Sequence, residues 1–198
     1  MKKIFMDKSF ISLIIFFITG LIIGIVFTFL LKEDDKTMIS KSILEYISLL
    51  KTSKITYSNF INSFLPSFLF INIIFISSFL FIFFPLIYFL NFYKGFISGF
   101  TIGALIISYR LKGVLYALIF AFPHELLLIL FILFISTLMI KNTIKLINIF
   151  KEDKSIKIRL FYKKFLVLYF GSILILILIT LLELFINTYL VKVLFWQT

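Results

Sequence analysis

Long apolar runs separated by short polar segments make up this chain. An apolar helix needs about 20 residues to cross the hydrocarbon core of a bilayer. Five runs reach this length, at residues 9–31, 64–84, 86–109, 114–140 and 165–190. Because the bilayer core gives the backbone no hydrogen-bond partners, such runs are expected to be helical. The pattern predicts an all-α, polytopic membrane helix bundle, one integral membrane domain over residues 1–198, with about five transmembrane helices.

Basic residues predict how these helices are oriented. Residues 1–8 hold three lysines, and residues 141–164 hold eight Lys or Arg side chains. Cytoplasmic segments of membrane proteins are enriched in both residue types. The chain is therefore expected to be a multi-pass protein of the cell (plasma) membrane, with a cytoplasmic N-terminus and a basic cytoplasmic loop at 141–164. Five crossings would leave the C-terminus outside.

The longest polar segment is expected on the outer side. Within it, residues 37–51 carry Ile39 and Ile43 on one helical face and Lys41 and Glu45 on the other. This spacing is typical of an amphipathic helix. We expect this helix to lie at the outer membrane surface or over the bundle, where it could meet an extracytoplasmic partner.

The composition supports a membrane protein and argues against nucleic acid. Hydrophobic residues make up 62% of the 198 residues and charged residues 15%, whereas soluble domains are about 45–50% apolar and about 25% charged. The net charge of +11 would suit nucleic acid, but the basic residues flank apolar runs and form no patch with interleaved aromatics. No nucleic-acid partner is therefore expected, and membrane lipids are the expected surroundings.

Residue types that catalyse reactions or bind metals are scarce. The chain has no cysteine and a single histidine, His124, so a zinc site is not expected. His124 and Glu125 begin like the HExxH motif of zinc proteases, but Leu128 stands where the second histidine is required. The sequence indicates no catalytic residue, no metal site and no cofactor.

Glycines recur every four residues in two of the apolar runs. Gly95, Gly99 and Gly103 share one face of the third predicted helix. Small residues let helix backbones approach closely in lipid, so this face is expected to pack against another helix. Gly20 and Gly24 form a second pair, in the first helix. That pair is either another packing site or a pair tolerated without a special role.

Polar residues interrupt the fourth and fifth runs. Pro123 has no N–H to donate, so it is expected to break the fourth helix near its middle. His124 and Glu125 follow it directly, and Glu183 lies in the fifth helix. Such groups are costly in lipid and mark either a proton or ion site or a structural contact. As a structural contact, His124 and Glu125 could bond across the bundle to Lys94, Arg110 or Glu183. Glu183 could itself pair with Lys94 or Arg110.

A set of motifs between residues 85 and 130 carries a family resemblance. They are Phe92-Tyr93-Lys94-Gly95-Phe96, Gly99-Phe100-Thr101 with Gly103, Lys112-Gly113, and Pro123 followed by a polar residue. In these motifs the chain resembles the stage II sporulation protein M family. The resemblance implies a membrane protein of five or six helices that is not an enzyme. Its sporulation member anchors the peptidoglycan-degrading stage II sporulation proteins D and P at the septum during engulfment.

Two functions remain open at this point. The first is a non-enzymatic scaffold that anchors or localises partners such as cell-wall-remodelling hydrolases, either alone or as a homo-oligomer. The second is a membrane subunit of a transporter, associated with an ABC ATPase or coupled to an ion. In the second, the broken fourth helix with His124 and Glu125 would line the path. The scaffold is the preferred interpretation.

Overall fold

The computed structural model describes residues 7–52, 56–110, 122–151 and 155–195. Within these ranges the chain forms six α-helices and one short 3-10 turn. They are α2 (Lys8–Leu30), α3 (Glu33–Thr52), α4 (Tyr57–Phe79), η1 (Phe81–Phe83), α5 (Phe84–Tyr109), α7 (Phe122–Lys151) and α8 (Ser155–Phe195). All except α3 and the short turn contain a segment long and apolar enough to cross a membrane, which makes five candidate spans. The expected all-α membrane bundle is confirmed.

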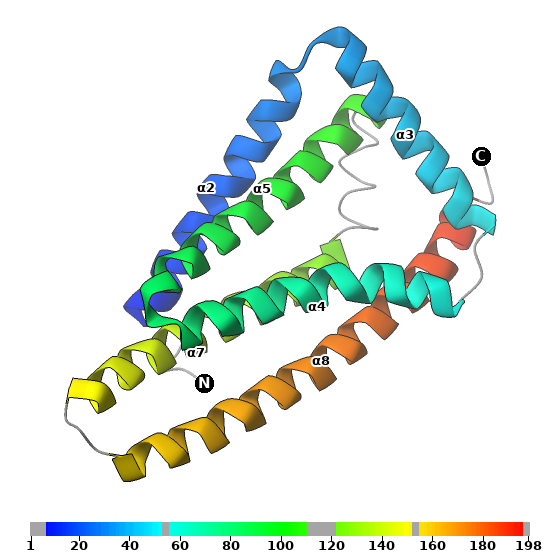
Figure 1. Ribbon diagram of the computed structural model, residues 1–198. Coiled ribbons are helices and arrows are strands. Elements are labelled where there is room, and N and C mark those ends of the chain that lie inside the picture. The colour runs from blue at the N-terminus through cyan, green and yellow to red at the C-terminus, as the bar shows by residue number, and fades with distance from the viewer. Residues whose placement is uncertain (1–6, 53–55, 111–121, 152–154, 196–198) are drawn as a thin grey trace.

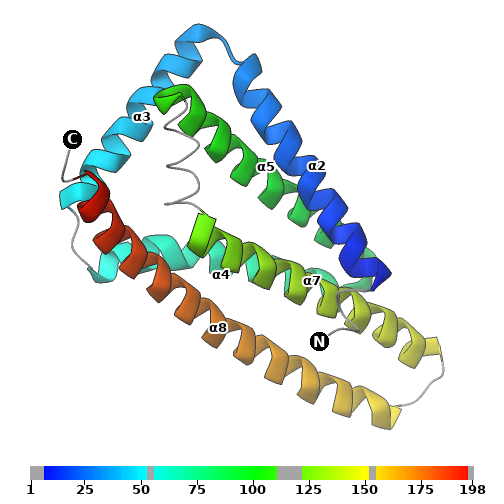
Figure 2. The ribbon, with the colours of Figure 1, turned by 180° about the vertical axis from the view of Figure 1, so that it is seen from behind.

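The five long helices alternate in direction (Figure 1). The beginnings of α2, α5 and α8 and the ends of α4 and α7 gather at one end of the bundle, at the lower left of Figure 1. We call this the gathered end. Towards the opposite end, α2 and α5 stay together while α4, α7 and α8 diverge from them, as Figure 2 shows from behind. Alternation of this kind suits five crossings, and the side that faces the cytoplasm stays a prediction.

Helix α3 is the amphipathic helix expected over residues 37–51. It begins at Glu33, and its first turn holds three acidic residues, which favour the positive end of the helix dipole. It crosses from the end of α2 to the C-terminal part of α8 (Figure 1) and contacts α5 and α8. The helix therefore covers the ends of the bundle opposite the gathered end.

The contact between α2 and α5 depends on glycines. The two helices run parallel and side by side (Figures 1 and 2). A Cβ added to Gly95 would meet the carbonyl oxygen of Phe17, and one added to Gly99 would meet that of Leu21. Both oxygens belong to the backbone of α2, so the two backbones touch with no side chain between them. Only residues without a side chain allow this approach.

Helix α2 adds its own glycine pair to the same interface. A Cβ on Gly20 would meet the carbonyl oxygen of Phe92, and one on Gly24 would meet that of Phe96. Of the two interpretations open for this pair, the structure shows packing against another helix. The glycines of each helix leave room for the backbone of the other helix, so both helices contribute to the close approach.

The remaining helical glycines differ in their surroundings. Gly103 faces Thr28, whose Oγ1 would lie 2.8 Å from an added Cβ and itself donates to the carbonyl oxygen of Gly24. Gly171 in α8 has nothing within 4 Å of an added Cβ. Position 171 can therefore take a side chain, whereas the glycines between α2 and α5 cannot.

Helices α4, α7 and α8 are longer than the apolar runs predicted. Helix α4 runs from Tyr57 to Phe79, so it both begins and ends earlier than the predicted run 64–84. Helix α7 continues to Lys151, and α8 begins at Ser155. Most of the segment 141–164, expected as a basic loop, is thus helical. The loop was expected from charge, but charge indicates the side of the membrane and leaves the backbone conformation open. Buried Leu146 extends the packed face of α7 beyond the apolar run, and lysine is itself a good helix former.

The predicted break of the fourth helix is only partly within the described residues. Pro123 lies in the first turn of α7, where the missing N–H removes no intrahelical hydrogen bond. The earlier part of the expected helix, residues 114–121, and Gly113 lie outside the described residues. The break at Pro123 therefore stays a prediction.

We expect Gly99→Ala to destabilise the protein, because the new methyl group would meet the Leu21 carbonyl, which is backbone and cannot rotate away. Gly171→Ala is the matched control, since it adds the same methyl group into open space. Both changes gain the same helix propensity, about 1 kcal/mol. In detergent, Gly99→Ala should lie below the control in the free energy of unfolding by about 1–3 kcal/mol. Equal stability would contradict close backbone packing at Gly99.

Candidate functional site

A charged contact inside the membrane region joins α5 to α7. Lys94 Nζ lies 2.8 Å from Glu125 Oε1, and Ser98 Oγ donates to the same oxygen over 3.0 Å. Lys94 and Ser98 are one turn apart on α5, so both reach the carboxylate from the same face. Of the partners left open for Glu125, Lys94 is the one that contacts it.

The surroundings of Glu125 compensate its charge. The side chains of Lys94 and Glu125 are 16% and 23% exposed, so both are largely withdrawn from the surroundings. Glu125 also lies in the first turn of α7, where the helix dipole favours a negative group. Because charge in a membrane interior must be paired, this contact can hold α5 and α7 in one register. The side chain of His124 lies outside the described residues, so its role stays a prediction.

A second polar contact between the same two helices was not predicted from the sequence. Asn91 is fully buried, and its Nδ2 donates to Ile87 O over 2.7 Å and to Ser136 Oγ over 2.9 Å. Its Oδ1 is the buried side-chain acceptor without a hydrogen-bond partner in the described part of the chain. A signal was available, because Asn91 precedes Gly95 by four residues and is an amide in an apolar run.

Hydroxyl and amide side chains also join α4 to its neighbours. Thr143 Oγ1 donates to Ser78 O over 3.0 Å, which links α7 to the end of α4. Tyr169 OH donates to Asn72 Oδ1 over 2.8 Å, which links α8 to the middle of α4. Polar contacts of this kind stabilise membrane bundles by fractions of a kcal/mol to about 2 kcal/mol each.

Glu183 has a different partner from those predicted. Ser63 Oγ donates to Glu183 Oε1 over 3.2 Å, which joins the first part of α4 to α8. Lys94, one of the two partners left open for Glu183, pairs with Glu125. The reason is tertiary, since α8 packs against α3, α4 and α7, whereas Lys94 faces α7.

An ion pair at the gathered end ties α2 to α7. Asp7 caps α2 by accepting from the Ser9 N–H over 2.9 Å, and its Oδ2 lies 2.6 Å from Lys141 Nζ. The hydrogen bond from Lys141, assisted by that from Ser9, lowers the pKa of the Asp7 carboxyl below its usual value. Asp7 therefore stabilises the fold most fully while it is ionised.

The described residues gather no metal-binding cluster. No group of three or more His, Cys, Asp or Glu side chains that could hold a metal ion occurs among them.

The Lys94–Glu125 contact should appear as a coupling energy. Lys94→Gln and Glu125→Gln each remove one charge of the ion pair and leave the other in place. Each change should therefore cost more stability in the wild-type protein than in the variant that already lacks the other charge. We expect a coupling of about 0.5–3 kcal/mol in a double-mutant cycle of detergent unfolding. Lys94→Gln combined with Glu183→Gln is the control and should be additive. Additivity in both cycles would show that the ion pair adds no stability.

Asp7→Asn should destabilise the protein in a manner that depends on pH. Because the folded-state pKa of Asp7 is lowered, its stabilisation is complete above the ordinary value of 3.8 and is lost as the pH falls through the folded-state pKa. The difference in melting temperature between wild type and Asp7→Asn should therefore be present at pH 7 and shrink below pH 3.8. Asp35→Asn, at an exposed position of α3, serves as the control. A difference that is constant over this range would contradict the assignment.

Comparison with known proteins places this arrangement in a family. The family model described as Stage II sporulation protein M matches residues 12–188. The match runs from the first turns of α2 into α8 and includes the glycine interface and the Lys94–Glu125 contact. No curated protein and no solved structure matches the chain. Since the matched segment covers most of the 198 residues, the chain belongs to the stage II sporulation protein M family.

Proposed function

We propose that the protein is a non-enzymatic membrane scaffold that anchors or localises partner proteins. The partners we infer are extracytoplasmic proteins that remodel the cell wall, such as hydrolases resembling stage II sporulation proteins D and P. Family membership supports this proposal, because the resemblance implies an anchoring role. The proposal also includes a cytoplasmic N-terminus, which puts α3 on the outer side.

The observation that carries the proposal is the use of the polar groups within the membrane. Lys94, Ser98 and Glu125 contact one another, and Glu183 contacts Ser63. Groups that bind or move a substrate need charged or hydrogen-bonding atoms that face a path through the protein. These groups instead contact the neighbouring helix. A bundle held in this way is a rigid support, as an anchoring protein requires.

Helix α3 is the surface we assign to the partner. Its partly buried side chains include Ile39 and Ile43, while Met38 and Leu44 are 68% and 48% exposed. Exposed apolar side chains beside charged ones are typical of a protein contact at the membrane surface. Because α3 rests on α5 and α8, it would present this surface in a constant position.

We expect Leu44→Lys to reduce co-purification of partners from native membranes in mild detergent by about tenfold, the effect of one buried apolar anchor. Ile144→Lys is the matched control, because the two side chains are 48% and 49% exposed but Ile144 lies near the gathered end. Mass spectrometry of the retained proteins should identify extracytoplasmic cell-wall proteins with wild type and control. Retention of an ATPase subunit, unchanged by Leu44→Lys, would overturn the scaffold and favour transport.

A further inference from the structure

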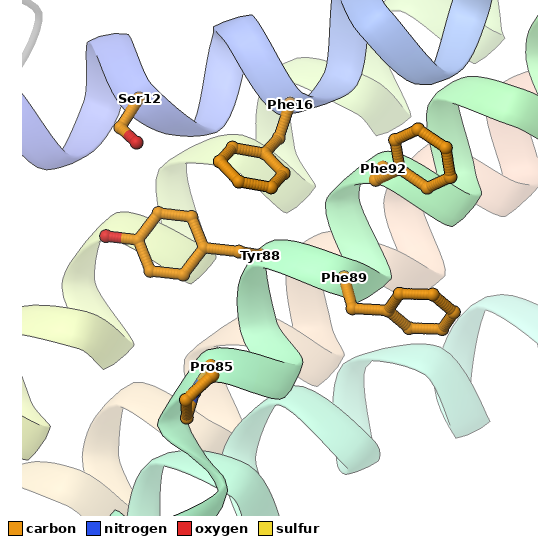
Figure 3. Close-up of a pocket in the computed structure, with 6 residues that line it drawn as sticks. All are labelled: Ser12, Phe16, Pro85, Tyr88, Phe89 and Phe92. Carbon is orange, nitrogen blue, oxygen red and sulfur yellow. The ribbon is translucent and has the colours of Figure 1, made fainter. Parts of the chain in front are cut away.

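An open groove lies between α2 and α5 near the gathered end. Its volume is about 400 Å³, and it is lined by Ser12, Phe16, Pro85, Tyr88, Phe89 and Phe92. Figure 3 shows the aromatic rings along the groove, with Ser12 on α2 at one end of it. Apart from the hydroxyls of Ser12 and Tyr88, these side chains are apolar, so the groove suits a hydrocarbon chain.

The position of the groove along the helices corresponds to one leaflet of the bilayer. Ser12 and Phe16 follow Lys8 by one and two helical turns, which is about 6 Å and about 12 Å at 1.5 Å per residue. Half of the hydrocarbon core is about 15 Å thick. The groove therefore begins near the membrane surface and ends before the midplane, as the upper part of an acyl chain does.

The groove opens away from the bundle. Phe16 and Phe89 are 43% and 58% exposed, although both lie within candidate membrane spans. The rings of Phe16 and Tyr88 contact each other, with centroids 5.4 Å apart, so the wall between the helices is well packed. An exposed apolar surface at this depth is in contact with lipid, and its concave shape can hold one chain.

An exposed lysine lies one helical turn before the polar end of the groove. Lys8 is exposed and precedes Ser12 by four residues, so it lies on the same face of α2, directly below the groove. Asp7 is the acidic group nearby, and Lys141 neutralises it. Exposed Lys145 follows Lys141 by one turn of α7. Among these described residues the lysines outnumber Asp7, which favours an anionic group over a zwitterionic one.

We propose that the groove between α2 and α5 binds one anionic phospholipid. One acyl chain lies along Phe16, Tyr88 and Phe92, and Lys8 pairs with the headgroup phosphate. The hydroxyls of Ser12 and Tyr88 lie between the two, at the level of the ester groups. This site is independent of the scaffold function, because it needs no protein partner.

Native mass spectrometry of the purified full-length protein tests this site. Delipidated protein is mixed with phosphatidylglycerol or phosphatidylcholine, and the fraction that carries one lipid is measured. Wild type should retain phosphatidylglycerol in preference to phosphatidylcholine. Lys8→Gln should reduce phosphatidylglycerol retention about fivefold, the effect of one lysine near the membrane surface. Lys163→Gln, at an exposed lysine of α8, is the matched control and should leave retention unchanged.

A second pair of variants tests the position of the acyl chain. Ser12→Phe fills the groove and should lower retention of both lipids, whereas Ile11→Phe, at a side chain 48% exposed and outside the groove, should not. A thermal unfolding measurement confirms that each variant is folded. Equal retention of the two lipids, or equal effects within either matched pair of folded variants, would overturn the proposal. Occupation of the groove by a second copy of the chain, detected as a cross-linked dimer through Tyr88, would overturn it also.

Discussion

The direct backbone contact between α2 and α5 is the constraint on which the rest of the bundle depends. Four glycines, two from each helix, lie against carbonyl oxygens of the other helix at positions where any Cβ would collide. In a membrane, apolar side chains gain nothing from leaving lipid for protein, so close packing must supply the attraction between helices. The glycines make that packing possible, and they place α5 where the neighbouring face, which carries Lys94 and Ser98, meets α7.

Polar contacts then determine how the other helices join this pair. Lys94 and Asn91 on α5 bond to Glu125 and Ser136 on α7, and α4 bonds to α7 and α8. Each contact removes a polar group from lipid and links two helices at one register. Contacts of this kind restrain the helices relative to one another, as the proposed scaffold function requires.

The two ends of the bundle differ in character. At the gathered end, Asp7 and Lys141 join α2 to α7, and exposed Lys8 lies one turn before the groove between α2 and α5. At the opposite end, α3 covers α5 and α8 with an acidic first turn and a mixed, exposed surface. We assign lipid binding to the first end and partner binding to the second, since the charges and the exposed side chains differ accordingly.

The sequence by itself determined the class of the protein and much of its local structure. Run length and composition predicted five membrane helices, and glycine spacing predicted a packing face on α5, because both depend on residues close together in the chain. Only the tertiary structure decided that Gly20 and Gly24 oppose Phe92 and Phe96, and that Lys94 pairs with Glu125. Periodicity identifies the face of a helix but not the helix that it meets, and several acids and bases were equally available as partners. The helical segment 141–151 was missed for a related reason, since charge predicts the membrane side of a segment and packing decides its conformation.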